Sequence, residues 1–223
     1  MPISTSDLLR EIKTALGPLA KDARQSTKSW DLYEVLVFGA AVASARDLGN
    51  VELLDAAGNP AKKFLFRSSP GPLAKPTQDF THAEVRIAGH PELEVHTGIW
   101  VIGKSQLPHE CDCVALLKAE ADAARASGRT PLWGPVLFHA ESKYYRRPIP
   151  FGHGRGFLGL GLDLGWQGST LVVNRHSPNA MELVRSRRRA AALRLSPGDQ
   201  TDLTLLKRRF RKRFAQYRKT GKV

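Results

Sequence analysis

The sequence contains only two cysteines, Cys111 and Cys113, and it has no long apolar run. One intervening residue is too short for a usual disulfide ring, so we expect two free thiols in a reducing compartment. No stretch approaches the ~18 to 20 consecutive apolar residues of a membrane span, and the opening residues lack the basic-then-apolar order of a signal peptide. The sequence therefore predicts a cytoplasmic protein that has no membrane segment.

The overall composition is that of a folded globular protein. Hydrophobic residues make up 42% of the 223 residues and charged residues 25%, which does not resemble a disordered chain. This length suits one well-buried α/β domain with an appendage and is too short for two domains of ordinary size. No internal repeat is visible, so we expect a single core.

Positive charge is concentrated in the C-terminal segment. From Arg185 onward the chain has 14 Lys or Arg against two acids, whereas residues 1–184 have 20 against 19, out of a net charge of +13. Such asymmetry is the usual footprint of a polyanion partner, because neutralised phosphates release condensed counterions. Nucleic acid is the leading candidate partner. A solvated basic face or a general anionic contact is the alternative.

The spacing of apolar residues predicts alternating helices and strands of an α/β fold. Helices are expected at 6–25 (interrupted at Gly17-Pro18), 30–49, around 157–164, 178–189 and 199–219. Strands are expected at 51–55, 62–69, 81–89, 92–104, 109–117, 136–145 and 169–176, and 118–128 suits a surface helix or a mobile excursion. We predict a central mixed β-sheet flanked by helices over 1–184, led by a helical segment at 1–28, with a basic C-terminal helical extension at 185–223.

Two of the predicted strands carry charged residues that have the spacing of a catalytic site. Asp112 lies in HECDCVALL, and about 30 residues later VLFHAESKYY contains Glu141 and Lys143. Residues i and i+2 of a strand share a face, so Glu141 and Lys143 project together. If the two strands pair, Asp112 joins them.

Two carboxylates that converge in this way repel each other unless a divalent cation lies between them. Hard oxygen ligands suit Mg²⁺ or Mn²⁺, which would polarise a phosphate and lower the pKa of a bound water. Lys143 would then position or help to deprotonate that water, or stabilise the charge that develops on phosphorus. The backbone carbonyl of Ser142 is a further candidate ligand.

The order of a helical Glu34, a strand Asp112 and then Glu141-Ser142-Lys143 resembles the PD-(D/E)xK, or restriction-endonuclease-like, nuclease superfamily. HECDCVAL followed by VLFHAESKYY is similar to prokaryotic members in which H-E-x-D precedes E-x-K. The resemblance covers roughly residues 30 to 175. It departs from the pattern at Cys111, because no proline adjoins Asp112.

This resemblance implies a restriction-endonuclease-like core and a Mg²⁺-dependent or Mn²⁺-dependent deoxyribonuclease. Asp112 and Glu141 would be metal ligands, Glu34 an outer or water-mediated ligand, and Lys143 the catalytic cation. It also suggests a role in prokaryotic defence or DNA repair, with a homodimer or partner proteins supplying target choice. The candidate phosphate contacts are Arg187, Arg188, Arg208, Arg209 and Arg211.

Each candidate residue also has a structural interpretation. Glu141 and Lys143 make a plausible surface ion pair at a strand end, and Glu110 is either a supporting group or a solvated acid. Glu94, His96 and His153 are expected to be structural. Glu34 lies in an apolar helix, where an acid is costly unless it is paired or ligating, so we expect it to have a role.

Three other functions compete with a nuclease. A non-catalytic nucleic-acid-binding module would keep a nuclease-like fold, and a subunit of a complex would use the C-terminal helix for docking. A zinc deaminase is suggested by His82-Ala83-Glu84 and the two cysteines, but C-D-C lacks the C-x-x-C spacing that one zinc ion needs. We therefore favour the nuclease, and a metal-dependent cleavage assay separates it from the binding module.

Overall fold

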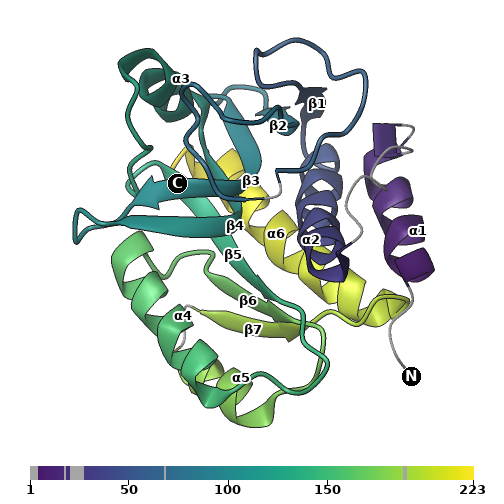
Figure 1. The fold of residues 1–223 in the computed structure, drawn as a ribbon. Coiled ribbons are helices and arrows are strands. Elements are labelled where there is room, and N and C mark those ends of the chain that lie inside the picture. The colour runs from purple at the N-terminus through teal and green to yellow at the C-terminus, as the bar shows by residue number, and fades with distance from the viewer. Residues whose placement is uncertain (1–4, 18, 21–27, 68, 188–189) are drawn as a thin grey trace.

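The computed structural model describes residues 5–17, 19–20, 28–67, 69–187 and 190–223, and its fold is α/β (Figure 1). Within these ranges the chain forms six helices and one seven-stranded sheet whose strands follow the chain in the order β1 to β7. Strands β1 to β5 pair antiparallel, and β6 and β7 join in parallel. The predicted mixed sheet flanked by helices is confirmed.

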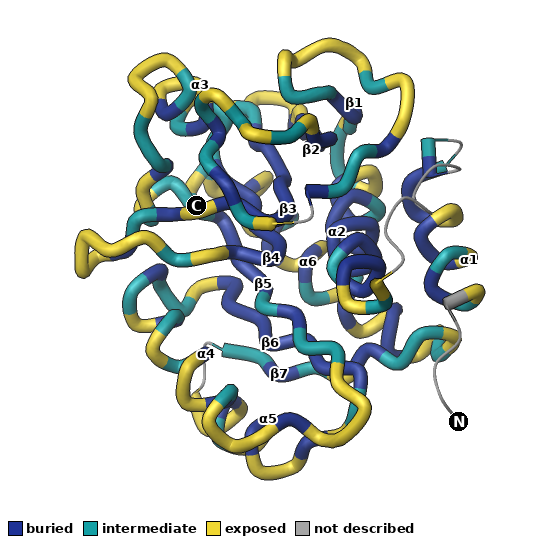
Figure 2. Tube along the Cα trace, viewed as in Figure 1, coloured by how far each residue is buried: buried dark blue, intermediate teal, exposed yellow. Residues whose placement is uncertain are grey.

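The sheet is built mainly from the strands that alternation predicted. Its members are β1 (Asn50–Leu54), β2 (His82–Arg86), β3 (Leu93–Ile102), β4 (Pro108–Leu117), β5 (Val136–Lys143), β6 (Thr170–Val173) and β7 (Ala191–Arg194). Helices α4 and α5 connect the three strands of the parallel part, as parallel neighbours require a crossover. The central strands are buried along most of their length (Figure 2).

The helices cover both faces of the sheet. They are α1 (Thr5–Leu16), α2 (Ser29–Arg46), α3 (Lys118–Ser127), α4 (Phe151–Leu164), α5 (Pro178–Arg185) and α6 (Gln200–Thr220). Helices α1, α2 and α6 share the largest core cluster with one face, on which Phe138 and Ala140 of β5 lie. The opposite face packs on α4 and α5, where Phe157 contacts the ring of His139 on β5 (centroids 6.1 Å). Successive β5 side chains thus point to α6 and to α4 in turn.

Helix α2 is buried on nearly all sides, as its apolar sequence predicts. Thirteen of its 18 residues are buried, because the sheet, α1 and α6 all contact it. The prediction of a helix over 30–49 is confirmed to within a few residues. Of the predicted lead-in helix, α1 is confirmed, and residues 21–25 lie outside the described part of the chain.

Two sequence predictions fail in the sheet. The predicted strand at 62–69 is wrong, since residues 62–67 form an irregular segment that shares single backbone bonds with Leu19 and Thr81. The apolar residues of this segment attach it to the core instead. The Phe64 ring packs on the ring of Phe38 in α2, with 5.6 Å between the centroids. The strand β7 was not predicted, because four residues between an arginine-rich stretch and a turn are too short for a clear alternation.

The basic C-terminal segment is part of the core. Strand β7 belongs to the sheet, and the α6 residues Phe210, Phe214 and Tyr217 are fully buried in the main cluster. Phe210 stacks on Phe138 with centroids 4.7 Å apart, and the Tyr217 hydroxyl donates to the Pro91 carbonyl at 2.7 Å. The segment expected as a helical extension over 185–223 therefore contains a strand and closes one face of the sheet.

The predictions about the two cysteines and about a membrane segment can also be compared with the structure. Cys111 and Cys113 are free and buried, as expected from their spacing. Among the helices of the described ranges, none has both the length and the apolar character needed to span a bilayer.

We predict that Phe214→Ala lowers the free energy of unfolding by about 3–5 kcal/mol, because it leaves a cavity against Phe138. Leu205→Ala on the same helix is the control, since Leu205 is 45% exposed and its loss should change stability by less than ~0.5 kcal/mol. Urea denaturation followed by circular dichroism measures both. Equal effects of the two substitutions would contradict a docked α6.

We also predict opposite effects for two glycine substitutions in α4. A Cβ on Gly156 meets nothing within 4 Å, so Gly156→Ala should raise stability by roughly 0.5–1 kcal/mol through helix propensity. A Cβ on Gly154 would lie 2.9 Å from the Ala180 carbonyl oxygen, so Gly154→Ala should lower stability by about 1–3 kcal/mol. Thermal melts of the two variants test how closely α4 approaches α5.

Candidate active site

The structure brings Asp112, Glu141 and Lys143 together on neighbouring strands. Cys113 of β4 pairs with Ala140 of β5 at the end of the paired stretch, and Asp112 and Glu141 are the residues that follow this pair on the two strands. The Lys143 ammonium lies 2.5 Å from Glu141 Oε1 and 4.0 Å from Asp112 Oδ2. The Ser142 backbone N–H donates to Asp112 Oδ2 at 2.6 Å and fixes that carboxylate.

Burial and mutual repulsion change the protonation of this group. Burial, together with the charge of Glu141, raises the pKa of Asp112 to about 7, although Lys143 and the Ser142 N–H oppose the rise. Burial also acts to lower the pKa of Lys143, but Glu141 and Asp112 outweigh it and raise this pKa to about 12. Lys143 is therefore a fixed cation at neutral pH.

Glu34 and Glu110 add further negative charge to the same place. Glu34 is half-buried on α2, and burial followed by the charge of Asp112 raises its pKa to about 9. Burial and then Glu141 raise the pKa of Glu110, while Lys143 acts to lower it. The helical Glu34 predicted for the site is thus within electrostatic reach of Asp112 and Lys143.

A cavity of about 460 Å³ opens between these strands and α4. Glu110, Glu141 and Lys143 line one side, and α4 supplies the other with Gly152, His153, Gly156, Phe157, Gly159 and Leu160. The α4 glycines at this wall expose bare backbone, which leaves the cavity wide enough for a ligand to approach closely. His153, expected to be structural, lies in this wall.

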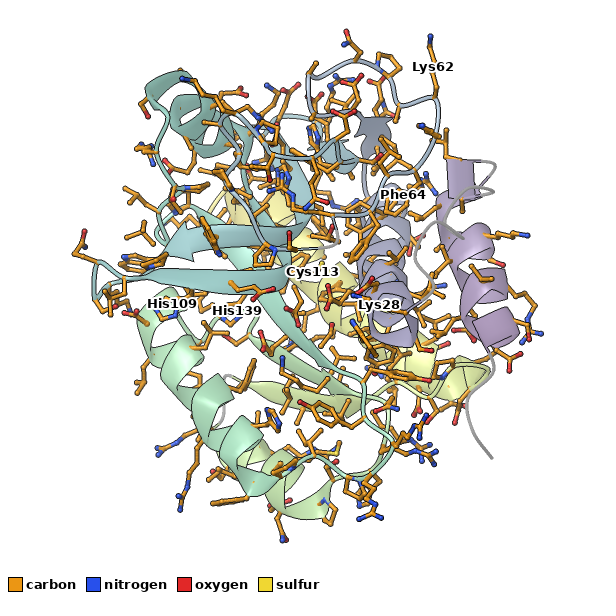
Figure 3. All side chains as sticks on the ribbon, viewed as in Figure 1. Lys28, Lys62, Phe64, His109, Cys113 and His139 are labelled. Atoms are coloured by element: carbon orange, nitrogen blue, oxygen red, sulfur yellow. The ribbon has the colours of Figure 1, made fainter. Side chains whose placement is uncertain are left out.

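Sequence reasoning missed the role of His109 in this cavity. His109 lines the cavity at the end of β4 above α4 (Figure 3), and its Nε2 is hydrogen-bonded to Asp163 of α4. Asp163 also accepts the backbone N–H of Ser105 at 2.7 Å, so the β3–β4 hairpin is tied to α4. The H-E-x-D motif contained the signal, but the sequence analysis assigned no role to its histidine.

Glu94 and His96, expected to be structural, belong to a separate buried network. Glu94 is bound by Arg125 at 2.6 Å and 3.0 Å and by His96 Nε2 at 2.7 Å. The His96 ring stacks on that of His82 with centroids 4.9 Å apart. Burial lowers the pKa of both histidines, and this explains them as neutral packing groups.

The deaminase constellation does not come together in the described structure. His82 and Glu84 lie on β2, whereas Cys111 and Cys113 lie on β4, and β3 separates these two strands. This arrangement places the two parts of the signature on non-adjacent strands.

Of the predicted phosphate-contact arginines, the three on α6 do not line the cavity. Arg208 and Arg211 are exposed on α6, which covers the face of the sheet opposite α4, and Arg211 forms an ion pair with Asp47 at 3.5 Å. Arg209 is half-buried, and its Nη2 lies 3.5 Å from the Ser169 carbonyl. Arg187 is exposed after α5, and Arg188 lies outside the described residues.

The donor atoms suit a hard cation, but they are not gathered around one point. In the described ranges no three His, Cys, Asp or Glu side chains form a group that could hold a metal ion. Glu141 is directed at Lys143 instead, and the Ser142 N–H occupies one Asp112 oxygen. A role for the Ser142 carbonyl stays a prediction.

Comparisons of the chain with protein-family models, with curated proteins and with solved structures found no match. Any function must therefore be inferred from the chemistry of the site itself.

We predict that Glu34→Gln raises the melting temperature at pH 8 by at least about 2 °C in a buffer containing a chelator. A folded-state pKa near 9 means that the folded protein holds a proton that the unfolded chain releases above its usual pKa of 4.5, so stability falls as pH rises through this window. Glutamine stays neutral and escapes this loss.

At pH 4 the two proteins should melt at nearly the same temperature, because Glu34 is then protonated in both states. Glu182→Gln on α5 is the matched control, since Glu182 is exposed. A pH-independent effect of Glu34→Gln would show that Glu34 is an ordinary packed residue.

Proposed function

We propose that this chain is a metal-dependent nuclease of the PD-(D/E)xK type that hydrolyses phosphodiester bonds in DNA. The observation that carries the proposal is the convergence of Asp112, Glu141 and Lys143 from two paired strands, with Glu141 and Lys143 lining the cavity and Asp112 buried beside them. The mixed sheet flanked by helices supports a restriction-endonuclease-like core.

The residues at the site offer oxygen donors, which are the ligands that a hard divalent cation prefers. Asp112 and Glu141 present carboxylate oxygens, Glu34 lies within electrostatic reach, and the Ser142 carbonyl is a further candidate. The raised pKa values of Asp112 and Glu34 also indicate that positive charge is too scarce at this point. Bound Mg²⁺ or Mn²⁺ would polarise the scissile phosphate and supply a nucleophilic water.

Lys143 has a defined part in this proposal. Glu141 and Asp112 outweigh burial and raise its pKa, so it is protonated at neutral pH and the proposal does not use it as the general base. It acts instead as a fixed positive charge that stabilises the negative charge developing on the phosphate oxygens. Its neighbours hold it in place, with Glu141 at 2.5 Å.

A binding module without catalytic activity is the second candidate. One observation favours it, namely that Glu141 is paired with Lys143 and that no group able to hold a metal is formed within the described residues. The two candidates differ in cleavage and not in binding. Activity in the presence of a divalent cation therefore separates them.

We predict that the purified protein cleaves DNA with Mg²⁺ or Mn²⁺ and that EDTA abolishes the activity. Lys143→Ala and Asp112→Asn should each lower the rate by at least about 100-fold, because each removes charge from the reacting centre. The assay follows labelled single-stranded and double-stranded DNA and RNA on denaturing gels. Lys212→Ala, an exposed lysine on α6, is the matched control and should keep full activity.

Circular dichroism must show that each variant is folded. Activity that is the same in wild type and Lys143→Ala would come from a contaminant and would defeat the nuclease proposal. Binding of DNA without cleavage would favour the binding module.

A further inference from the structure

The segment between β5 and α4 is a second basic region. It is not visible in the charge count of residues 1–184, because acids elsewhere in that range balance it. From Ser142 to Leu162 the sequence contains four Lys or Arg and no acid. Arg146, Arg147 and Arg155 are exposed, and Lys143 lines the cavity. Unlike the arginines of α6, these side chains lie on the segment that leads from the cavity strand into the helix of its opposite wall.

Two exposed aromatic rings accompany these cations. Tyr145 and Phe151 are each 40% exposed, although large aromatic side chains are usually far more buried. The Tyr145 ring lies 5.2 Å from the ring of His153, which lines the cavity. The Arg155 guanidinium stacks over Phe151 at 4.8 Å from the ring centroid. Aromatic and cationic groups thus form a rim next to the cavity wall, since Phe151 and Arg155 adjoin the lining residues Gly152 and Gly156 in α4.

The backbone beneath these rings is firmly held. The buried Asn174 side chain accepts the Tyr145 N–H and donates to the Tyr145 carbonyl, both at 2.9 Å. The Ile149 N–H donates to Ser177 Oγ at 2.9 Å, and the Ile149 side chain is buried. Tyr145 and Phe151 are therefore presented by a fixed segment, and a bound ligand need not order it first.

Exposed aromatic rings beside basic residues have a specific chemical use. Unpaired bases stack on aromatic side chains, and phosphates bind the cations between them. A duplex hides the faces of its bases inside the helix, so it has nothing to stack on Tyr145 or Phe151. The bare wall of α4 glycines leaves room for a strand to pass between the helix and Lys143.

We infer that this rim, comprising Tyr145, Arg146, Arg147, Phe151 and Arg155, binds single-stranded DNA and leads it to the cavity. The inference rests on the proposed nuclease function and narrows its substrate to an unpaired strand. Bases stack on Tyr145 and Phe151, and the arginines with Lys143 contact the phosphates. The arginines of α6 are not needed for this contact, because they cover the opposite face of the sheet.

Fluorescence anisotropy with labelled oligo(dT) in EDTA tests the inference without cleavage. We expect wild type to bind oligo(dT) more tightly than a duplex of the same length. Tyr145→Ala and Phe151→Ala should each weaken binding about tenfold. Tyr145→Phe should bind like wild type, since the ring and not the hydroxyl provides the stacking surface.

The double variant Arg208→Ala with Arg211→Ala is the matched control for lost charge, and it should bind oligo(dT) within about threefold of wild type. Arg146→Ala with Arg147→Ala removes the same number of charges at the rim and should weaken binding at least tenfold and reduce its salt dependence.

The outcomes separate this inference from the nuclease proposal. If the protein binds oligo(dT) selectively but cleaves no nucleic acid, the result would support single-strand binding by the rim and would contradict the nuclease proposal. Cleavage of duplex DNA, with no preference for a single strand and no effect of Tyr145→Ala, would overturn the inference and keep the nuclease. Tighter binding of oligo(rU) than of oligo(dT) would overturn the assignment to DNA.

Discussion

The site depends on one constraint: a single half-buried lysine, Lys143, must balance several carboxylates. Asp112, Glu34 and Glu110 all have raised pKa values, which shows that Lys143 and the Ser142 N–H do not fully compensate their charge. A fold selected for stability alone would replace such acids with apolar residues. Their presence around Lys143, from α2 and β4, is the kind of strain that functional sites retain.

In the same sheet, the network around Glu94 fully compensates the charge of a buried carboxylate. Glu94 is as buried as Asp112, yet Arg125 and two histidines surround it. Burial acts to raise its pKa, but the hydrogen bond from His96 and the bonds from Arg125 outweigh burial and hold the pKa well below its usual range. Two buried acids on adjacent strands thus have opposite pKa shifts. The difference lies in their cations, and it marks Asp112 as the acid that lacks a partner of sufficient charge.

The sequence was sufficient for the parts of the site that depend on local geometry. Alternation along β5 placed Glu141 and Lys143 on one face, and the pairing of β5 with β4, which the prediction left as a condition, brings Asp112 within 4.0 Å of Lys143. The opposite wall depends on how α4 packs across the sheet, which no local pattern records. His109 and the glycines of α4 therefore went unrecognised. The strand β7 and the irregular segment around Phe64 were mispredicted for the related reason that tertiary contacts, not alternation, fix them.

Counting charges over long segments gave the net charge of the chain but did not show which basic residues lie near the cavity. The arginine-rich helix α6 was expected to meet phosphate, but Phe210, Phe214 and Tyr217 use it to close the core, and its cations face away from the cavity. Meanwhile the acids of other elements masked the basic segment from Ser142 to Leu162 in the near-neutral count of the first 184 residues. A sliding count would have separated the two regions.

The position of α6 in the chain also has a consequence for biosynthesis. Because α6 follows every strand of the sheet, the ribosome releases the seven strands before the helix that covers one face of them. Until then Phe138 and its apolar neighbours on that face are open to other molecules. A nascent chain in this state is prone to aggregate, and its Asp112 and Lys143 rest on a sheet that is not yet rigid. Completion of α6 is therefore the step that covers this apolar face and makes the sheet beneath Asp112 and Lys143 rigid.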